Sequence, residues 1–356
     1  MLFSPMKLGA MELPNRLVMA PLTRIRAGRA GIPGPLLVEH YRQRASLGLI
    51  VSEGTYPSHA GQGFAGQPGL VTAEQLAGWA NVTSAVHEEG GRIFAQVMHA
   101  GRVTHEGITG GHRVIAPSAL AIEGETRTYE GKKPYPVPHS PSTEELAGVI
   151  QEFVTASVKA IEAGFDGVEL HGANGYLLHE FLSPGSNQRD DTYGGTPENR
   201  ARFVIEVTQA VVAAIGAQRV GIRLSPEHNI QGTLELDAAD VRETYGILVD
   251  ALEPLGLAYL SVLHRDPASA LVQELRSKFK GTFLVNSGFG VITTREEALS
   301  LLADDLADAV VVGRPAIANP DLVRRWQEDL PLNEPDAATF YGPDAIGYTD
   351  YPFHQN

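Results

Sequence analysis

The feature that most constrains the fold of this chain is an alternation of short apolar runs with longer helical patterns. The runs are nearly continuous in apolar residues, as parallel strands covered on both faces must be. Eight such runs occur, at residues 16–20, 48–52, 92–97, 167–170, 220–224, 258–262, 282–285 and 309–312. Eight strand–helix units with right-handed crossovers close most economically into a (β/α)8 TIM barrel. A doubly wound open sheet is the rival fold, but no Gly-x-Gly-x-x-Gly follows the first run.

Helix starts between these runs carry recognisable capping chemistry. Capping boxes are predicted at Thr72–Gln75, at Ser142–Glu145 and over residues 293–296, with Thr293 as the cap and Glu296 as its partner. At residues 196–198, a Thr-Pro-Glu run supplies a cap, a first-turn proline and a first-turn acid. The helix after Ser142 shows apolar spacing typical of one buried face, at Leu146, Val149, Ile150, Phe153, Ser157 and Ile161, and ends at Gly164. The next helix ends at Gly216 in the same way.

The chain shows no linker and no break in composition, so residues 1–356 are predicted to form a single domain with an N-terminal hairpin. Two connections are unusually long, namely residues 98–142 after the third strand and 171–196 after the fourth. Long ordered loops in a compact domain are usually functional. Both loops leave the C-terminal ends of their strands, where TIM barrels place their active sites.

Composition excludes several classes of function. The net charge is 28 − 42 = −14, which disfavours binding to nucleic acid. The chain has no cysteine, so disulfides, thiolate catalysis, Cys-ligated zinc and iron–sulfur clusters are excluded. No apolar run approaches the roughly 18 residues of a membrane span, and no secretory signal is evident. We therefore expect a cytoplasmic protein with no membrane or nucleic-acid partner.

Residues at the C-terminal ends of the strands should converge on one mouth of the barrel. They include Pro21, Leu22, Thr23, Gly54, Gln96, His171, Asn174, Tyr176, Arg223, Ser287, Gly288, Gly290, Gly313 and Arg314. After strands seven and eight, glycines and Arg314 suit a phosphate, although each glycine alone fits a simple turn. Gln96 and Arg223 fit either an internal hydrogen-bond network or the edge of a flat heterocycle, whose reduced anionic form a fixed cation would stabilise.

His171, Asn174 and Tyr176 form a tight cluster after the fourth strand. An imidazole and an amide can donate two hydrogen bonds to one oxygen, and a phenol can donate a proton. As a bare spacing the cluster also fits loop packing. A zinc site is a weaker alternative, because the histidines available for it, His99, His171, His179 and His264, lack paired ligand spacing. We expect no metal.

The sequence from His171 to Phe203, HGANGYLLHEFLSPGSNQRDDTYGGTPENRARF, resembles the long motif of the Old Yellow Enzyme family of flavin-dependent ene-reductases. Supporting blocks lie along the whole chain, at residues 15–23, 52–55, 96–102, 313–320 and 339–352. The resemblance implies a TIM barrel that binds FMN non-covalently. It implies that NADPH reduces the FMN, and that flavin N5 then passes a hydride to the β-carbon of an activated alkene while a proton reaches the α-carbon.

The resemblance also implies residue roles. Pro21, Leu22, Thr23 and Gly54 would line the isoalloxazine, Gln96 would bind its pyrimidine edge and Arg223 would stabilise the reduced anion. The residues implied to hold the phosphate are Ser287, Gly288, Gly290, Gly313 and Arg314. For the substrate, His171 and Asn174 would bind its carbonyl or nitro oxygen and Tyr176 would deliver the proton. Met98 and Tyr351 would line its pocket. The implied partners are NAD(P)H and small activated alkenes, nitro compounds or quinones, and the protein would be a monomer or a weak homo-oligomer.

By this resemblance, Thr23 and Tyr176 are similar to those of the classical members of the family, and Met98 is a departure from many of them. Thr23 stands where another group of members has Cys, and Met98 stands where many members have Trp. A thioether is smaller and softer than an indole, so we expect a roomier pocket or an altered substrate orientation. The tail aromatics Tyr348, Tyr351 and Phe353 either roof the pocket or simply pack against the barrel.

Three other functions share this pattern in part. A flavin-free phosphate-sugar aldolase or isomerase would use the same barrel, but no lysine at a strand end suits a Schiff base. A flavin-dependent RNA-modifying barrel conflicts with the charge of −14 and the absence of cysteine. A non-catalytic flavin carrier would not need the set His171, Asn174 and Tyr176.

Overall fold

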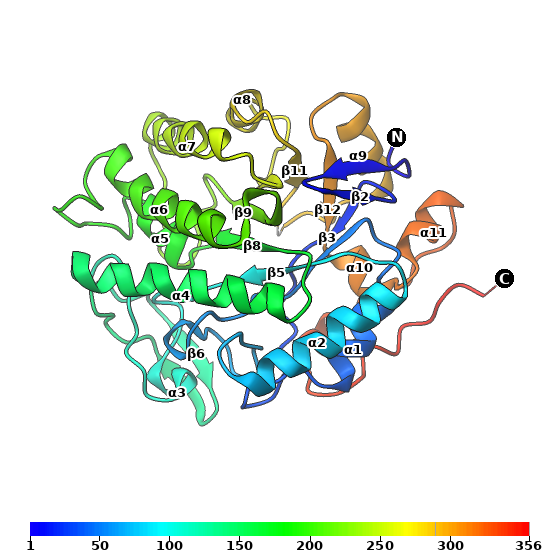
Figure 1. Ribbon diagram of the computed structural model, residues 1–356, viewed down its shortest axis with the longest axis horizontal. Coiled ribbons are helices and arrows are strands. Elements are labelled where there is room, and N and C mark those ends of the chain that lie inside the picture. The colour runs from blue at the N-terminus through cyan, green and yellow to red at the C-terminus, as the bar shows by residue number, and fades with distance from the viewer. Residues whose placement is uncertain (289, 356) are drawn as a thin grey trace.

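The computed structural model describes residues 1–288 and 290–355, and its centre is a closed barrel of eight parallel strands (Figure 1). The strands of the barrel are β3 (Leu17–Met19), β4 (Leu49–Val51), β5 (Ile93–Val97), β8 (Gly167–Gly172), β9 (Val220–Leu224), β10 (Tyr259–Leu263), β11 (Phe283–Asn286) and β12 (Ala309–Val312). Each strand pairs with the next in chain order, and β12 closes the ring on β3 with Val310 opposite Leu17. This confirms the predicted barrel and all eight predicted strands, and it excludes the open sheet.

Helices surround the barrel because each strand is followed by a segment with an apolar stripe. The helices are α1 (Pro35–Arg42), α2 (Ala73–Glu88), α3 (Glu106–Thr109), α4 (Thr143–Glu162), α5 (Leu177–Leu182), α6 (Pro197–Ile215), α7 (Ala238–Leu252), α8 (Ala270–Lys278), α9 (Arg295–Ala303), α10 (Arg314–Ala318) and α11 (Leu322–Gln327). Short 3-10 turns add His59–Gly61, Ala217–Arg219, Glu253–Leu255 and Ala337–Thr339. In the described part of the chain, no helix has the length and apolarity needed to cross a membrane.

Most predicted helix ends are confirmed. Both halves of the capping box form at Thr72 and at Ser142, and Thr196 caps α6 ahead of its first-turn proline. The prediction that Thr293 caps the ninth helix is wrong by one residue. Thr294 is the cap and accepts a hydrogen bond from Glu297 N–H, whereas the Thr293 hydroxyl is buried against Ser287. Consecutive threonines leave the cap ambiguous in the sequence, and the buried contact decides it.

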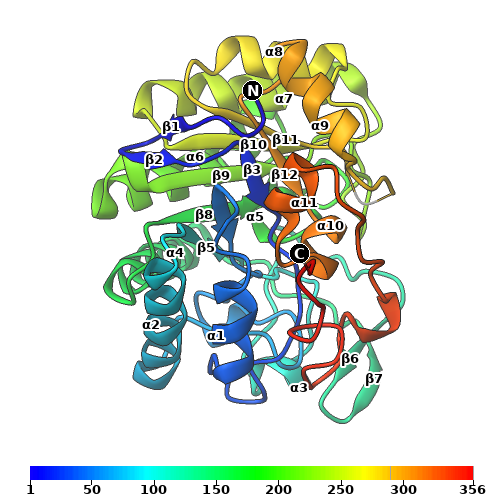
Figure 2. The same ribbon diagram turned by 90° about the vertical axis from the view of Figure 1, so that its right-hand side faces the viewer.

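The predicted N-terminal hairpin is present, and it covers the end of the barrel where the strands begin (Figure 2). It consists of β1 (Met6–Leu8) and β2 (Met11–Leu13), which pair antiparallel. Its buried side chains, Leu8 and Leu13, pack with the lower layer of the barrel interior, including Phe94 and Tyr259. The hairpin therefore seals the barrel at the end opposite the predicted site.

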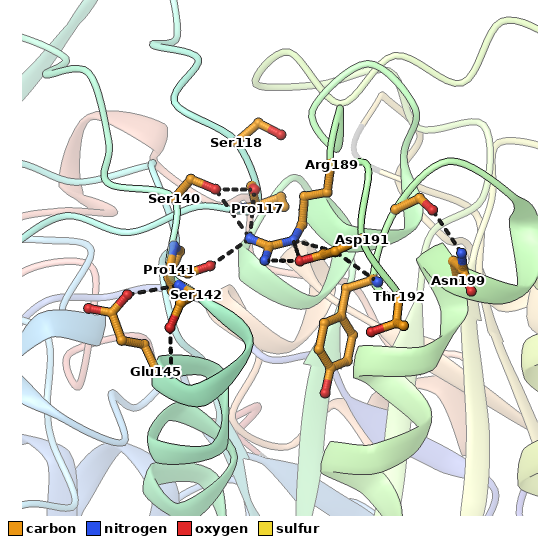
Figure 3. A network of polar contacts seen from close by, with 12 residues as sticks. Pro117, Ser118, Ser140, Pro141, Ser142, Glu145, Arg189, Asp191, Thr192 and Asn199 are labelled. Atoms are coloured by element: carbon orange, nitrogen blue, oxygen red, sulfur yellow. Dashed lines mark hydrogen bonds and ion pairs between the residues drawn. The ribbon is translucent and has the colours of Figure 1, made fainter.

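The two long loops lie together at the other end of the barrel. The loop after β5 carries the hairpin of β6 (Glu125–Thr128) and β7 (Gly131–Pro134), and the loop after β8 carries α5. Arg189, in the loop after β8, connects the two loops (Figure 3). Its Nη1 donates hydrogen bonds to the carbonyls of Pro117 and Pro141, in the loop after β5, at 3.2 and 2.7 Å. Asp191 pairs with the same guanidinium. The long motif thus braces the loops that frame the mouth of the barrel.

Candidate active site

A cavity of about 740 Å³ opens at the C-terminal ends of the strands. Twelve of the predicted site residues line it: Pro21, Leu22, Thr23, Gln96, Met98, His171, Asn174, Tyr176, Arg223, Gly288, Gly313 and Arg314. They come from six different strands or the loops that follow them. The structure therefore brings residues that are almost 300 positions apart into one cavity, as the barrel topology requires.

Four predicted residues are not in the lining. Gly54 packs against Met98, a residue of the lining, since a Cβ at position 54 would come within 2.6 Å of Met98 Sδ. Ser287 is buried, and its hydroxyl lies 3.0 Å from that of Thr293. Gly290 is exposed, with open space around it. Tyr351 lies apart from the cavity, where its hydroxyl accepts a hydrogen bond from Asp336 N–H. Phe289, which completes the predicted glycine-rich loop, lies outside the described residues.

The inner wall of the cavity is a buried polar network on neighbouring strands. Gln96 lies opposite Glu169 in the register, and its amide donates to that carboxylate at 2.8 Å. The second carboxylate oxygen accepts from the Tyr259 hydroxyl at 3.0 Å. With its nitrogen held by Glu169, the Gln96 amide is fixed in orientation, and its carbonyl oxygen is left as an acceptor for a ring N–H.

Arg223 supplies the positive charge of this wall. Its Nη2 donates to Asn286 Oδ1 at 2.9 Å, while its buried Nε has no hydrogen-bond partner in the described part of the chain. Burial lowers the pKa of Arg223, and the charge of Glu169 opposes that shift. Burial likewise raises the pKa of Glu169, against the influence of Arg223. A guanidinium nevertheless stays protonated near neutral pH, so the wall holds a fixed cation.

His171, Asn174 and Tyr176 lie at the end of β8, on the same cavity. Because side chains two apart on a strand share a face, His171 points to the same side as Glu169. The backbone then turns sharply, with Asn174 in the left-handed region at φ 59°, and Tyr176 caps α5. The rings of His171 and Tyr176 have centroids 5.1 Å apart. One imidazole, one amide and one phenol therefore face a common space.

His171 and Tyr176 are in protonation states that allow each of them to donate a hydrogen bond. Burial, reinforced by the charges of Arg223 and His179, holds the pKa of His171 well below its usual value, so the ring is neutral at pH 7. Burial also raises the pKa of Tyr176, with the amide of Gln231 acting in the opposite direction. The phenol thus keeps its proton near neutral pH and can deliver it.

A strained loop after β3 borders the cavity. Ile25 adopts a left-handed conformation at φ 52°, which a β-branched residue rarely does. The buried carboxylate of Glu53 holds this conformation by accepting the backbone N–H groups of Arg24 and Ile25 at 3.1 and 3.0 Å. Burial raises the pKa of Glu53 to about 7. The sequence block 52–55 therefore contributes a clamp on the loop that carries Thr23.

Of the two alternatives for the aromatic residues of the C-terminal tail, the structure favours packing against the barrel over roofing of the pocket. Tyr348 is fully buried and stacks on His40 with ring centroids 4.0 Å apart, and Phe353 is 51% exposed. None of Tyr348, Tyr351 and Phe353 is in the lining, whereas Phe340 and Tyr341 are. The block 339–342 was visible in the sequence, but aromatic residues along an irregular tail have no periodicity that says which of them face the barrel.

Other lining residues were not predicted, including Phe64, Tyr135 and Arg127. They come from the loop after β4 and from the hairpin β6–β7 and its flank, where no strand register marks them in advance.

The histidines considered for zinc are separated. His179 pairs with Glu235 and His264 with Glu227, both at 3.1 Å, while His99 Nδ1 accepts from Gly101 N–H. Over residues 1–288 and 290–355, no group of three or more acidic or histidine side chains could hold a metal ion.

Comparison with known proteins agrees with this geometry. Residues 1–333 match the family described as NADH:flavin oxidoreductase / NADH oxidase. The chain belongs to this family. It is 42% identical to a probable flavin mononucleotide-dependent alkene reductase of Leishmania infantum, over 99% of this chain and 97% of the other. It is 39% identical to 12-oxophytodienoate reductase 7 of Oryza sativa subsp. japonica, over 99% and 94% of the two chains.

Solved structures show the same relationship. The Old Yellow Enzyme homologue from Zymomonas mobilis superposes with a TM-score of 0.93 at 40% identity, covering 99% of each chain. Morphinone reductase, solved in complex with tetrahydroNAD, superposes with a TM-score of 0.94 at 42% identity, over 100% of this chain and 98% of the other. The Old Yellow Enzyme resemblance is thereby confirmed, and the protein is an oxidoreductase of an FMN-dependent family.

The cavity fits the cofactor of this family. Arg223 Nε and His171 Nδ1 are buried without partners among the described residues, although both side chains line the cavity. Gly313 leaves open space, since a Cβ there would find its nearest neighbour at 3.6 Å. Gly288 has φ +95°, which a glycine adopts without strain. In one part of the cavity, Arg223 Nε and His171 Nδ1 can therefore bind polar atoms of a ligand. In another part, Gly288 and Gly313 beside Arg314 leave room for an anion.

Proposed function

We propose that residues 1–356 form a single FMN-binding TIM-barrel domain that reduces activated alkenes at the expense of NADPH. The observation that carries this proposal is the placement of His171, Asn174 and Tyr176 on the same cavity as the buried guanidinium of Arg223. Donors for a substrate oxygen and a cation for a reduced ring are the two requirements of this chemistry. The names of the relatives, an alkene reductase and a morphinone reductase solved with tetrahydroNAD, support the same reading.

In this proposal, Pro21, Leu22, Thr23 and Gly54 lie along the flavin ring, Gln96 accepts from its pyrimidine edge and Arg223 stabilises its reduced form. The phosphate group is held by the loops after β11 and β12, through Ser287, Gly288, Gly290, Gly313 and Arg314. Bound FMN would supply the hydride-transfer chemistry that links NADPH to the β-carbon of the alkene. Side chains of this protein bind the substrate and donate the proton.

His171 and Asn174 bind the carbonyl or nitro oxygen of the substrate, which draws electron density from the alkene and favours attack at the β-carbon. Tyr176 then donates its proton to the α-carbon. Met98 borders the substrate space from the end of β5, and Phe340 and Tyr341 close it from the tail. Tyr351, away from the lining, has no role in this proposal. Enones, nitroalkenes and quinones all offer the oxygen that this site would bind.

No lysine is among the described residues that line the cavity, so a Schiff-base aldolase has no nucleophile here. The absence of cysteine supports a reducing compartment such as the cytoplasm.

The decisive experiment is spectroscopic. The purified protein should be yellow, should bleach under anaerobic conditions with NADPH, and should recover its colour when cyclohexenone is added. A parallel titration with NADH tests whether NADPH is the preferred electron donor. Faster bleaching by NADH would show that NADH is preferred instead. A colourless protein that also fails to bind added FMN would rule out the proposed function.

A further inference from the structure

Asn174 is held by a loop that the mechanism above does not use. This loop joins β9 to α7 and contains His228 and Gln231. Ser225 Oγ accepts the backbone N–H of Asn174 at 2.8 Å, and Gln231 Nε2 donates to its carbonyl at 2.7 Å. On the side chain, Oδ1 lies 3.2 Å from His228 Nδ1. Within the described residues, only the amide nitrogen Nδ2 is left without a hydrogen bond, and Asn174 lines the cavity.

The chemistry of this contact fixes two features. An amide oxygen can only accept, so the imidazole nitrogen that faces it must carry a proton. Burial lowers the pKa of His228 to about 4, with His179, Arg223 and His264 acting in the same direction and Glu235 opposing them. The ring is therefore neutral near pH 7, and its single proton lies on Nδ1.

We propose that His228 is a positioning residue for Asn174: its Nδ1–H holds Oδ1 so that Nδ2 is the atom presented to the substrate oxygen. A carboxamide is nearly symmetric in shape, so packing alone would allow the opposite orientation. That orientation would set Oδ1 against the substrate oxygen, acceptor against acceptor. The inference rests on the proposed function, because it takes Asn174 as a donor to substrate.

Phenol binding tests this role without turnover. A phenolate oxygen bound over the flavin gives a long-wavelength absorption band, so titration measures a dissociation constant. We expect His228→Leu, which removes the donor, to weaken binding about tenfold, the effect of losing one oriented hydrogen bond. His228→Asn places an amide nitrogen close to the position of the imidazole Nδ1 and should bind within about threefold of wild type.

A double variant separates positioning from general damage. If His228 acts only through Asn174, then His228→Leu should not weaken phenol binding further in an Asn174→Ala background. Additive losses in the double variant would overturn the inference, as would wild-type affinity in His228→Leu. Flavin absorbance of each variant reports whether the cavity has remained intact.

The tautomer gives a second readout that needs neither substrate nor turnover. Nitrogen-15 spectra of the histidine-labelled protein, with His228 assigned through His228→Asn, should show a proton on Nδ1 at pH 7. A proton on Nε2 would refute the inference even if His228→Leu failed to fold. Failure of the proposed function would look different, because wild-type protein would then show no flavin band or no phenol band.

Discussion

At the scale of single residues, burial decides the protonation of the groups that matter. Tyr176 lies edge-on to Phe64, with ring centroids 6.3 Å apart, and close to the His171 ring. These neighbours offer little solvation to a phenolate, which is why the pKa of Tyr176 is raised. The same exclusion of water lowers the pKa of His171 and keeps its ring neutral, so both side chains hold a proton that they can donate in a hydrogen bond.

Tyr176→Phe removes the proton donor and keeps the ring. We expect reduction of an enone to slow by about 10²–10⁴-fold, the usual contribution of a general acid, while bleaching of the flavin by NADPH is spared. Stopped-flow measurement of the two half-reactions separates these effects. Tyr135→Phe alters another phenol of the cavity lining and serves as the matched control. Equal slowing of both half-reactions in Tyr176→Phe would remove this residue from the proposed role.

Glu180 on α5 is, like Glu53 and Glu169, a buried acid, and it lies outside the cavity lining. Its Oε1 accepts Arg102 N–H at 2.9 Å, while Oε2 is buried with no partner in the described residues. Burial raises the pKa of Glu180 to about 8, and the charge of Arg102 only partly opposes the shift. Because the folded state binds this proton more tightly than the unfolded state, its contribution to stability is full at low pH and is lost as the pH rises towards 8.

Glu180→Gln imitates the protonated carboxyl at every pH. We expect the variant and wild type to melt at similar temperatures near pH 5, and the variant to melt higher above pH 8. The difference in the free energy of unfolding between the variant and wild type should grow by at most about 1.4 kcal/mol per pH unit. This growth should occur between the pKa of Glu180 in the unfolded state and its higher pKa in the folded state. Melting curves from pH 5 to pH 9 measure it, with Glu88→Gln on α2 as an exposed control. A difference that does not change with pH would contradict the assignment.

At the scale of elements, the C-terminal tail is held by arginines through its backbone. Arg26 donates to the carbonyls of Asp344, Phe340 and Thr339 at 2.8, 3.1 and 2.9 Å, and its guanidinium lies 4.1 Å from the centre of the Tyr348 ring. Apart from the short 3-10 turn Ala337–Thr339, this tail is irregular, so many of its carbonyls have no regular backbone ladder to pair with and can accept from side-chain donors. These bonds therefore fix where Phe340 and Tyr341 stand on the cavity.

Arg26→Met keeps the length of the side chain but removes all of these donors. We expect amide exchange in residues 339–348 to become at least about tenfold faster, because the tail loses the bonds that protect it locally. Hydrogen-exchange mass spectrometry with peptide resolution measures this change. The control is Arg29→Met, since the Arg29 guanidinium lies on the Tyr129 ring instead. Unchanged protection of the tail in Arg26→Met would show that side-chain packing alone holds it.

At the scale of the whole molecule, the closed barrel brings loops that are distant in sequence to one end. The space between these loops is not filled by side chains. The bottom is sealed by the hairpin β1–β2, whereas the top holds the cavity of about 740 Å³ with unpartnered atoms of Arg223 and His171. A ligand that fills this space and satisfies these atoms must stabilise the folded state.

FMN should therefore raise the melting temperature of protein stripped of its flavin. The gain follows ligand concentration and reaches about 2.7 kcal/mol at one hundred times the dissociation constant. Riboflavin, which has the same ring without the phosphate, should stabilise less at equal concentration, because the loops around Gly288, Gly313 and Arg314 are proposed to bind the phosphate. Thermal scans with either ligand measure this, and equal stabilisation by both would exclude a phosphate site there.

Short-range features of the sequence determined the strands, most helix caps and the N-terminal hairpin of this protein. The eight apolar runs, the capping boxes at Thr72 and Ser142 and the hairpin at the N-terminus depend on contacts near in sequence, so they could be predicted. Strand ends converge in any such barrel, which is why Gln96, His171 and Arg223 could be placed on one site before their contacts were known.

Only the tertiary structure decided the rest. A buried contact with Ser287, only six residues away, chose Thr294 over Thr293 as a cap. Contacts between segments far apart in sequence buried Tyr348 on His40 and left Tyr351 away from the cavity. The same is true of Glu53, which clamps the loop at Ile25, and of His228, which meets Asn174 across 54 positions. No periodicity marks such residues, because their partners are set by how loops pack on the finished barrel.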